Sequence, residues 1–244
     1  GEALSMTQDD VKLNGWAIEN RLYAEDPYRN FLPSIGRLTR YRPPEEISSE
    51  SYVVRNDTGV FEGGEISMYY DPMIAKLCTW APSRQLAIDH MRTALDRFEV
   101  EGIGHNLPFL SAVMDHAKFV SGDMTTAFIG EEYPDGFEGV RLGEGALKKI
   151  AASCAAMNRV AEIRRTKITG RLDNHERKIG NDWVVNLQGQ SFTVTIAADP
   201  QGSDVVFEDG ETLRVSGSWV PGQSLAEMTV AQSSLVMKVS KISG

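Results

Sequence analysis

The chain has 244 residues, of which 41% are hydrophobic and 24% are charged, a composition typical of one large or two smaller globular domains. Its 25 basic and 34 acidic residues give a net charge of −9, which argues against a nucleic-acid or anionic-membrane partner. No apolar run approaches the roughly 20 residues that span a bilayer, and the first residues lack the pattern of a signal peptide. We therefore expect a soluble intracellular protein.

The cysteines and histidines show no spacing that indicates a metal site or a redox-active cysteine pair. Cys78 and Cys154 are the two cysteines, and they belong to no C-x-x-C or Cys/His motif. The four histidines likewise follow no metal-ligand spacing. We expect free thiols, a reducing compartment and no metal ligands.

Residues 15–81 alternate between short apolar and polar stretches separated by Gly, Pro, Asn and Asp, which predicts an antiparallel sheet. Ser83 then suits the N-cap of a helix whose apolar positions follow helical spacing as far as a stop at Gly102. A second helix is expected to begin near Asn106 and Pro108. Residues 1–130 would thus form one α+β domain.

Residues 131–142 are rich in Gly and acidic residues and lack periodicity, which favours a linker. The domain expected at 143–244 begins with a long helix that is apolar around most of its circumference and must be enclosed on several sides. From Trp183 the apolar period changes to two over about six strands, with turns at Gly189-Gln190, Asp209-Gly210 and Pro221-Gly222. We expect a long helix wrapped by an antiparallel β-barrel, and the pattern leaves open whether this barrel is complete.

One strand carries an unusual set of polar side chains. In "GWAIENRLYAEDP" the alternation places Trp16, Ile18 and Leu22 on one face, with Glu19, Arg21 and Tyr23 on the other. Arg21 could form a solvated ion pair with Glu19, or Glu19 could orient its planar fork towards an oxyanion.

A second polar group lies at a predicted strand boundary. Tyr69, Tyr70 and Asp71 precede Pro72, and this set suits either a small polar ligand or a structural turn.

The stretches "GWAIENRLYAEDPYRNFLPSIGRLTRYRPP", "YYDPMIAKL" and "GIGHNLPFL" resemble the C-terminal subdomain of biotin carboxylase, the ATP-grasp component of biotin-dependent carboxylases. The resemblance implies that Arg21 lies near the ureido oxygen of biotin and stabilises its enolate-like form during carboxylation, with Tyr70 and Asp71 also at the biotin site. It further implies biotin as cofactor, bicarbonate as substrate, and ATP with Mg²⁺ bound mainly by residues that precede this segment.

The second half resembles the domain that, in propionyl-CoA carboxylase α subunits, docks onto the carboxyltransferase β subunit. "KITGRLDNHERKIGNDW" would then be the docking loop, with Arg171, Leu172, Asp173, His175 and Ile179 as contacts, although a polar connection between helix and barrel explains it equally well. The other implied partners are a biotin carboxyl carrier domain and a second biotin carboxylase subunit. The implied compartment is the bacterial cytoplasm or the mitochondrial matrix.

These resemblances identify the chain as part of an acyl-CoA carboxylase α subunit, a ligase that acts in the ATP- and bicarbonate-dependent carboxylation of biotin. By itself the segment is not expected to catalyse this reaction. The alternative is a non-catalytic assembly module of another biotin-dependent carboxylase, specific for acetyl-CoA, methylcrotonyl-CoA or pyruvate.

Overall fold

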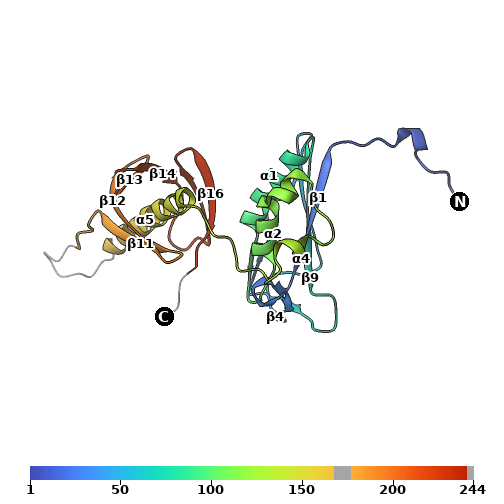
Figure 1. Cartoon of the computed structure of the whole chain (residues 1–244), viewed down its shortest axis with the longest axis horizontal. Coiled ribbons are helices and arrows are strands. Elements are labelled where there is room, and N and C mark those ends of the chain that lie inside the picture. Colours follow the sequence, from blue (N-terminus) through green and yellow to red (C-terminus); the bar gives the residue numbers. More distant parts are fainter. Residues whose placement is uncertain (168–176, 241–244) are drawn as a thin grey trace. The chain divides into compact units, whose positions relative to one another are not determined.

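The computed structural model describes residues 1–167 and 177–240, and the chain divides into two compact units, 1–140 and 141–244 (Figure 1). Unit 1 contains, in order, η1 (Gln8–Asp10), β1 (Trp16–Tyr23), β2 (Glu25–Asp26), η2 (Pro27–Arg29), β3 (Leu32–Pro33), β4 (Gly36–Arg37), β5 (Arg40–Arg42), β6 (Ile47–Ser48), β7 (Val53–Thr58), β8 (Glu65–Ile66), β9 (Met73–Ala81), α1 (Arg84–Arg97), β10 (Glu99–Glu101), α2 (Leu107–Asp115), α3 (Ala117–Ser121) and α4 (Phe128–Glu132). Unit 2 contains α5 (Glu144–Thr166), β11 (Asp182–Leu187), β12 (Gln190–Asp199), β13 (Gly202–Phe207), β14 (Thr212–Gly217), β15 (Leu225–Val230) and β16 (Ser233–Lys238). None of the helices in these described ranges is long and apolar enough to cross a membrane.

The main sheet of unit 1 is antiparallel, with strand order β1-β9-β7-β6. Its inner face packs against α1 and α2, which lie on one side of β1 and β9 in Figure 1. Leu22, Leu77 and Met91 are each at most 1% exposed in this core. The opposite face of the sheet is therefore free to carry the polar side chains of β1, β9 and β7.

Helix α1 begins as its sequence predicts and ends earlier than expected. The Ser83 hydroxyl accepts a hydrogen bond from the Leu86 amide at 3.3 Å, which caps the first turn. The helix ends at Arg97 and not at Gly102, because residues 99–101 pair with β5 as strand β10. Gly102 follows at φ +103°, where a Cβ atom would meet the Arg37 carbonyl and lie 2.8 Å from the Thr39 amide nitrogen. Only glycine fits this turn without strain.

The segment 131–139, which its composition suggests is a linker, is part of unit 1 and packs against the rest of that unit. Phe137 is 4% exposed, and its ring lies 5.4 Å from that of Phe109 and 5.7 Å from that of Tyr133. The edge-to-face geometry of these rings is typical of stabilising aromatic contacts. Periodicity does not reveal this packing, because it is made by isolated aromatic side chains in an irregular segment.

Unit 2 consists of α5 and a single sheet in which the six strands β11 to β16 follow one another in antiparallel order. The sheet curls around α5, which runs within the curve of the strands in Figure 1. Ala151, Ala152 and Ala155 are at most 1% exposed, and their small side chains let the strands approach the helix closely. The predicted α+β fold, with an antiparallel sheet and helices followed by a helix wrapped by antiparallel strands, is confirmed. The strands form a half-barrel whose edges, among the described residues, are β11 and β16.

A charged cluster holds α5 in its place along the sheet. The ammonium group of Lys148 binds the carboxylates of Asp209 and, at 2.7 Å, Glu211, both in or near the turn between β13 and β14. Lys148 itself is only 8% exposed. A buried lysine that is not neutralised is costly, so these two carboxylates specify which turn of α5 faces the β13–β14 hairpin.

Candidate functional site

The open face of the unit 1 sheet carries Arg21, the principal candidate residue. Side chains of β1 alternate between the core and solvent, so Asn20 and Leu22 are buried while Glu19 and Arg21 point outwards. Strand pairing places Arg21 opposite Lys76 of β9, and Lys76 in turn opposite Asp57 of β7. Trp16, which alternation places on the same face as the buried Leu22, is 55% exposed at the start of the strand.

Arg21 is charged, accessible and only partly engaged. Its Nε donates to a carboxylate oxygen of Glu19 at 2.8 Å, and the two side chains are 57% and 42% exposed. The Glu19 carboxylate, followed by the Tyr23 hydroxyl, raises the pKa of the Arg21 guanidinium, while Arg21 lowers the pKa of Glu19. A guanidinium has five N–H donors, so this arrangement leaves donors for an external oxyanion.

The backbone around Arg21 is held by Asn106, which precedes helix α2. The Asn106 side chain accepts from the Tyr23 amide at 2.9 Å and donates to the Arg21 carbonyl at 3.1 Å. The backbone amide of Asn106 donates to the Tyr23 carbonyl at 3.2 Å. Asn106 is 6% exposed and takes the place of a neighbouring strand along the free edge of β1. Local sequence predicts for Asn106 only a place at the start of a helix, because a contact across 85 residues leaves no local signal.

The two other candidate biotin residues differ in how close they come to this strand. The Ala24 amide donates to the Pro72 carbonyl at 2.8 Å, which ties the segment after Asp71 to the end of β1. The Asp71 carboxylate caps the next turn by accepting a hydrogen bond from the Met73 amide at 3.1 Å. The pKa of Glu25 is raised first by its burial and second by the negative charge of Asp71. Tyr70 is 82% exposed. The structure thus brings Asp71 to the same end of the sheet as Arg21, with Tyr70 exposed beside it in the chain.

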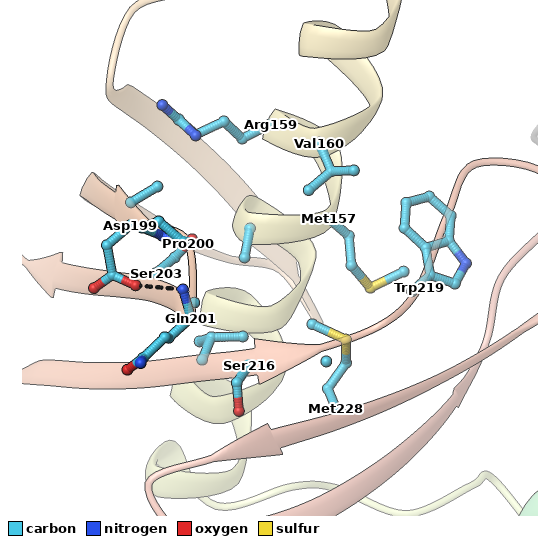
Figure 2. Close-up of a pocket in the computed structure, with 15 residues that line it drawn as sticks. Met157, Arg159, Val160, Asp199, Pro200, Gln201, Ser203, Ser216, Trp219 and Met228 are labelled. Carbon is cyan, nitrogen blue, oxygen red and sulfur yellow. Dashed lines mark hydrogen bonds between the residues drawn. The ribbon is translucent and has the colours of Figure 1, made fainter.

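A cavity of about 270 Å³ in unit 2 lies between α5 and the strands. Figure 2 shows the sulfur atoms of Met157 and Met228 beside the indole of Trp219, with the turn that contains Asp199 and Gln201 across the cavity. The Gln201 amide donates to Asp199 at 2.7 Å, and so does a guanidinium nitrogen of Arg214. The lining mixes apolar side chains with polar ones such as Arg159 and Asp199, and it contains no nucleophile paired with a base.

Most of the predicted docking contacts lie outside the residues that the structure describes. Arg171, Leu172, Asp173 and His175 lie outside the described residues. Ile179 is half-buried in the irregular segment before β11. Within the described ranges, no group of three or more His, Cys, Asp or Glu side chains could hold a metal ion.

Two family models match the chain in succession. The biotin carboxylase C-terminal domain matches residues 19–131, and the propionyl-coenzyme A carboxylase BT domain matches residues 150–244. A propionyl-CoA carboxylase alpha chain from Ruegeria pomeroyi is 68% identical over 259 aligned residues, which cover 100% of this chain and 38% of the relative. This chain belongs to the biotin-dependent carboxylases. The match of its second unit to the propionyl-CoA carboxylase model disfavours the alternative of a module from another carboxylase.

More distant relatives of this carboxylase chain agree. The mitochondrial propionyl-CoA carboxylase alpha chain of Sus scrofa is 36% identical over 90% of this chain and 30% of its own length. Among solved structures, the biotin carboxylase domain dimer of Hydrogenobacter thermophilus 2-oxoglutarate carboxylase, in complex with MgADP, ADP and bicarbonate, is similar with a TM-score of 0.53 at 39% identity. That match covers 58% of this chain and 30% of the solved chain. The chain thus spans about a third of the length of the proteins it matches.

Proposed function

We propose that this chain acts within a longer propionyl-CoA carboxylase α chain, where unit 1 takes part in the ATP- and bicarbonate-dependent carboxylation of biotin. The observation that carries the proposal is the 68% identity to the Ruegeria pomeroyi alpha chain along the whole of this chain. The order of the two matching family models, biotin carboxylase C-terminal domain before BT domain, supports the same assignment.

The open face of the sheet fits the ureido group of biotin. Biotin, when bound, supplies a ureido nitrogen that carries the carboxyl group, and its ureido oxygen gains negative charge as that nitrogen becomes nucleophilic. Arg21 offers this oxygen a permanent positive charge and unengaged N–H donors on an accessible side chain. Glu19 fixes the direction of the guanidinium through Nε, and Asn106 fixes the strand that carries it. Asp71 and Tyr70 are assigned to the border of the same site.

ATP, Mg²⁺ and bicarbonate are proposed ligands of the complete α chain and not of this segment alone. The MgADP and bicarbonate in the Hydrogenobacter thermophilus structure support this part of the proposal. A second biotin carboxylase subunit is proposed by analogy with the dimer in that structure, and a biotin carboxyl carrier domain is proposed to deliver biotin. We retain the bacterial cytoplasm or mitochondrial matrix as the proposed location.

The catalytic part of the proposal is tested by Arg21→Ala in the full-length α chain, with biotin-dependent ATP cleavage as the readout. We expect kcat to fall by about 10² to 10³-fold, the usual effect of removing a donor to a developing oxyanion. Arg42→Ala is the matched control, because Arg42 is similarly exposed and has its own partner, Glu62, at 3.6 Å. Equal activity of the Arg21 and Arg42 variants would leave unit 1 with a role in assembly only.

Unit 2 is proposed to dock onto a carboxyltransferase β subunit, as a BT domain. The test is gel filtration of this chain mixed with a propionyl-CoA carboxyltransferase β subunit, with and without replacement of residues 168–180 by a Gly/Ser linker. Co-elution that the replacement abolishes would support the docking loop. Co-elution that survives the replacement would assign docking to the half-barrel instead, and no co-elution of a folded chain would contradict docking by this unit alone.

A further inference from the structure

The C-terminal end of α5 concentrates positive charge in an acidic chain. The whole chain has a net charge of −9, yet the described residues 159–167 and 177–180 contain six basic side chains and one acidic side chain. The acidic one is Glu162, which is 6% exposed and pairs with both Arg165 and Arg177. One carboxylate leaves most of these cations uncompensated within the segment, so this end of the helix attracts anions.

Two of these cations connect the end of α5 to the cavity of unit 2. Arg159 lines the cavity, and its Nε is buried without a hydrogen-bond partner among the described residues. Arg164 donates from Nη1 to the Pro221 carbonyl at 3.0 Å, in the segment that follows Trp219. This acceptor is uncharged, so the charge of Arg164 is not neutralised by it. The basic end of α5 and the cavity thus belong to one surface.

Apolar side chains at this cavity are also exposed. Val160 lines the cavity and is 43% exposed, and Val220, next to Trp219 in the chain, is 48% exposed. Figure 2 shows Val160 and Met157 on α5, with the indole of Trp219 beside the Met157 sulfur. The volume of about 270 Å³ has room for one apolar side chain of the size of leucine or phenylalanine. Exposed valines are ordinary when they are scattered, but grouped at a cavity they indicate an interaction surface.

We propose that this α5-end surface binds an acidic segment of the carboxyltransferase β subunit, which inserts one apolar side chain into the cavity. The surface consists of Arg159, Val160, Arg164, Lys167, Trp219 and Val220. Its cations require a partner of opposite charge, and its cavity accommodates the buried anchor on which binding energy is usually concentrated. Asp199 also lines the cavity, but its carboxylate is paired with Arg214 at 2.7 Å, so the acidic residues of the partner lie on the α5 side. This inference rests on the proposed docking of unit 2, to which it adds a surface and the chemistry of the partner.

The test measures Kd and kon between variants of the full-length α chain and a propionyl-CoA carboxyltransferase β subunit, by biolayer interferometry at several salt concentrations. Val160→Asp places a carboxylate on the apolar part of the surface and should raise Kd at least about 10-fold. Val160→Ala keeps a helix-favouring residue and should raise Kd about fivefold, so it reports the contact even if Val160→Asp lowers the melting temperature. Lys167→Glu should lower kon about 3- to 10-fold and weaken its dependence on salt, because the charge that steers association is reversed.

Matched control variants lie elsewhere on unit 2. Val206→Asp changes a valine on β13 that is 36% exposed, and Arg141→Glu reverses an exposed cation before α5. Both should bind the β subunit within about twofold of wild type, with the wild-type dependence on salt. A loss of binding in these controls equal to that of the Val160 and Lys167 variants would overturn the inference, because the effect would not belong to this surface.

The outcomes separate this inference from the proposed docking itself. If the Val160 and Lys167 variants bind within about twofold of wild type while replacement of residues 168–180 abolishes binding, the α5-end surface is wrong and docking through the loop survives. If the wild-type α chain does not bind the β subunit, both proposals are wrong.

Discussion

Asn106 is predicted to be the residue that stabilises the strand carrying Arg21. Replacing it with alanine removes both side-chain hydrogen bonds, at 2.9 and 3.1 Å, and leaves the Tyr23 amide and the Arg21 carbonyl without these partners. A buried group left unpaired costs about 1–3 kcal/mol. Two groups lose their partners, so we expect Asn106→Ala to lower the free energy of unfolding of unit 1 by about 2–6 kcal/mol.

The assay for this prediction is hydrogen exchange of the peptide that contains β1, together with urea unfolding of unit 1. Exchange of the Tyr23 amide should accelerate strongly in Asn106→Ala. Asn56→Ala is the matched control, because the Asn56 side chain makes one hydrogen bond, to the Tyr41 hydroxyl at 3.2 Å, and its oxygen is buried without a partner. An Asn106 variant no less stable than the Asn56 variant, with unchanged exchange at Tyr23, would refute this reasoning.

Three further predictions concern the turn after β10 and the charges of unit 2. Gly102→Ala should destabilise unit 1 by at least about 1–2 kcal/mol in urea unfolding, because alanine is strained at φ +103° and its Cβ meets the backbone; an unchanged midpoint would contradict this. Arg214, together with the Gln201 amide, holds the pKa of Asp199 at about 2. The stability gained from the Asp199 pair is present above the ordinary aspartate pKa and is lost as the pH falls towards 2. In an NMR titration Arg214→Gln should raise the pKa of Asp199, and no change would contradict the pairing. Lys148→Met should lower the melting temperature of unit 2 more than Lys149→Met, because it leaves two carboxylates without their shared cation, whereas Lys149 donates one hydrogen bond to the uncharged hydroxyl of Ser233; equal melting temperatures would contradict this role.

Local pattern was sufficient for the type and order of most elements. The long apolar helix expected at the start of the second domain is α5, Glu144–Thr166, and it is enclosed by the strands. The Ser83 cap and the start of α2 after Asn106 also follow from short-range chemistry. Each of these features is decided by residues within a few positions of one another, where spacing and capping propensities are informative.

Features set by contacts between residues distant in the chain could not be predicted from local pattern. The alternation in β1 placed Arg21 on the polar face, but only the register with β9 reveals Lys76 beside it. The hydrogen bonds of Asn106 and the burial of Phe137 depend on contacts with residues distant in the chain. The assignment of Arg21 to biotin stays a prediction, since alternation and an ion pair with Glu19 suit both a solvated strand and a binding site.

The most direct test of the account is a crystal structure of the full-length α chain with biotin and bicarbonate bound. The account predicts that the ureido oxygen lies about 3 Å from a guanidinium nitrogen of Arg21, on the open face of the β1-β9-β7 sheet. Biotin bound at another surface, with Arg21 facing only solvent and Glu19, would contradict it.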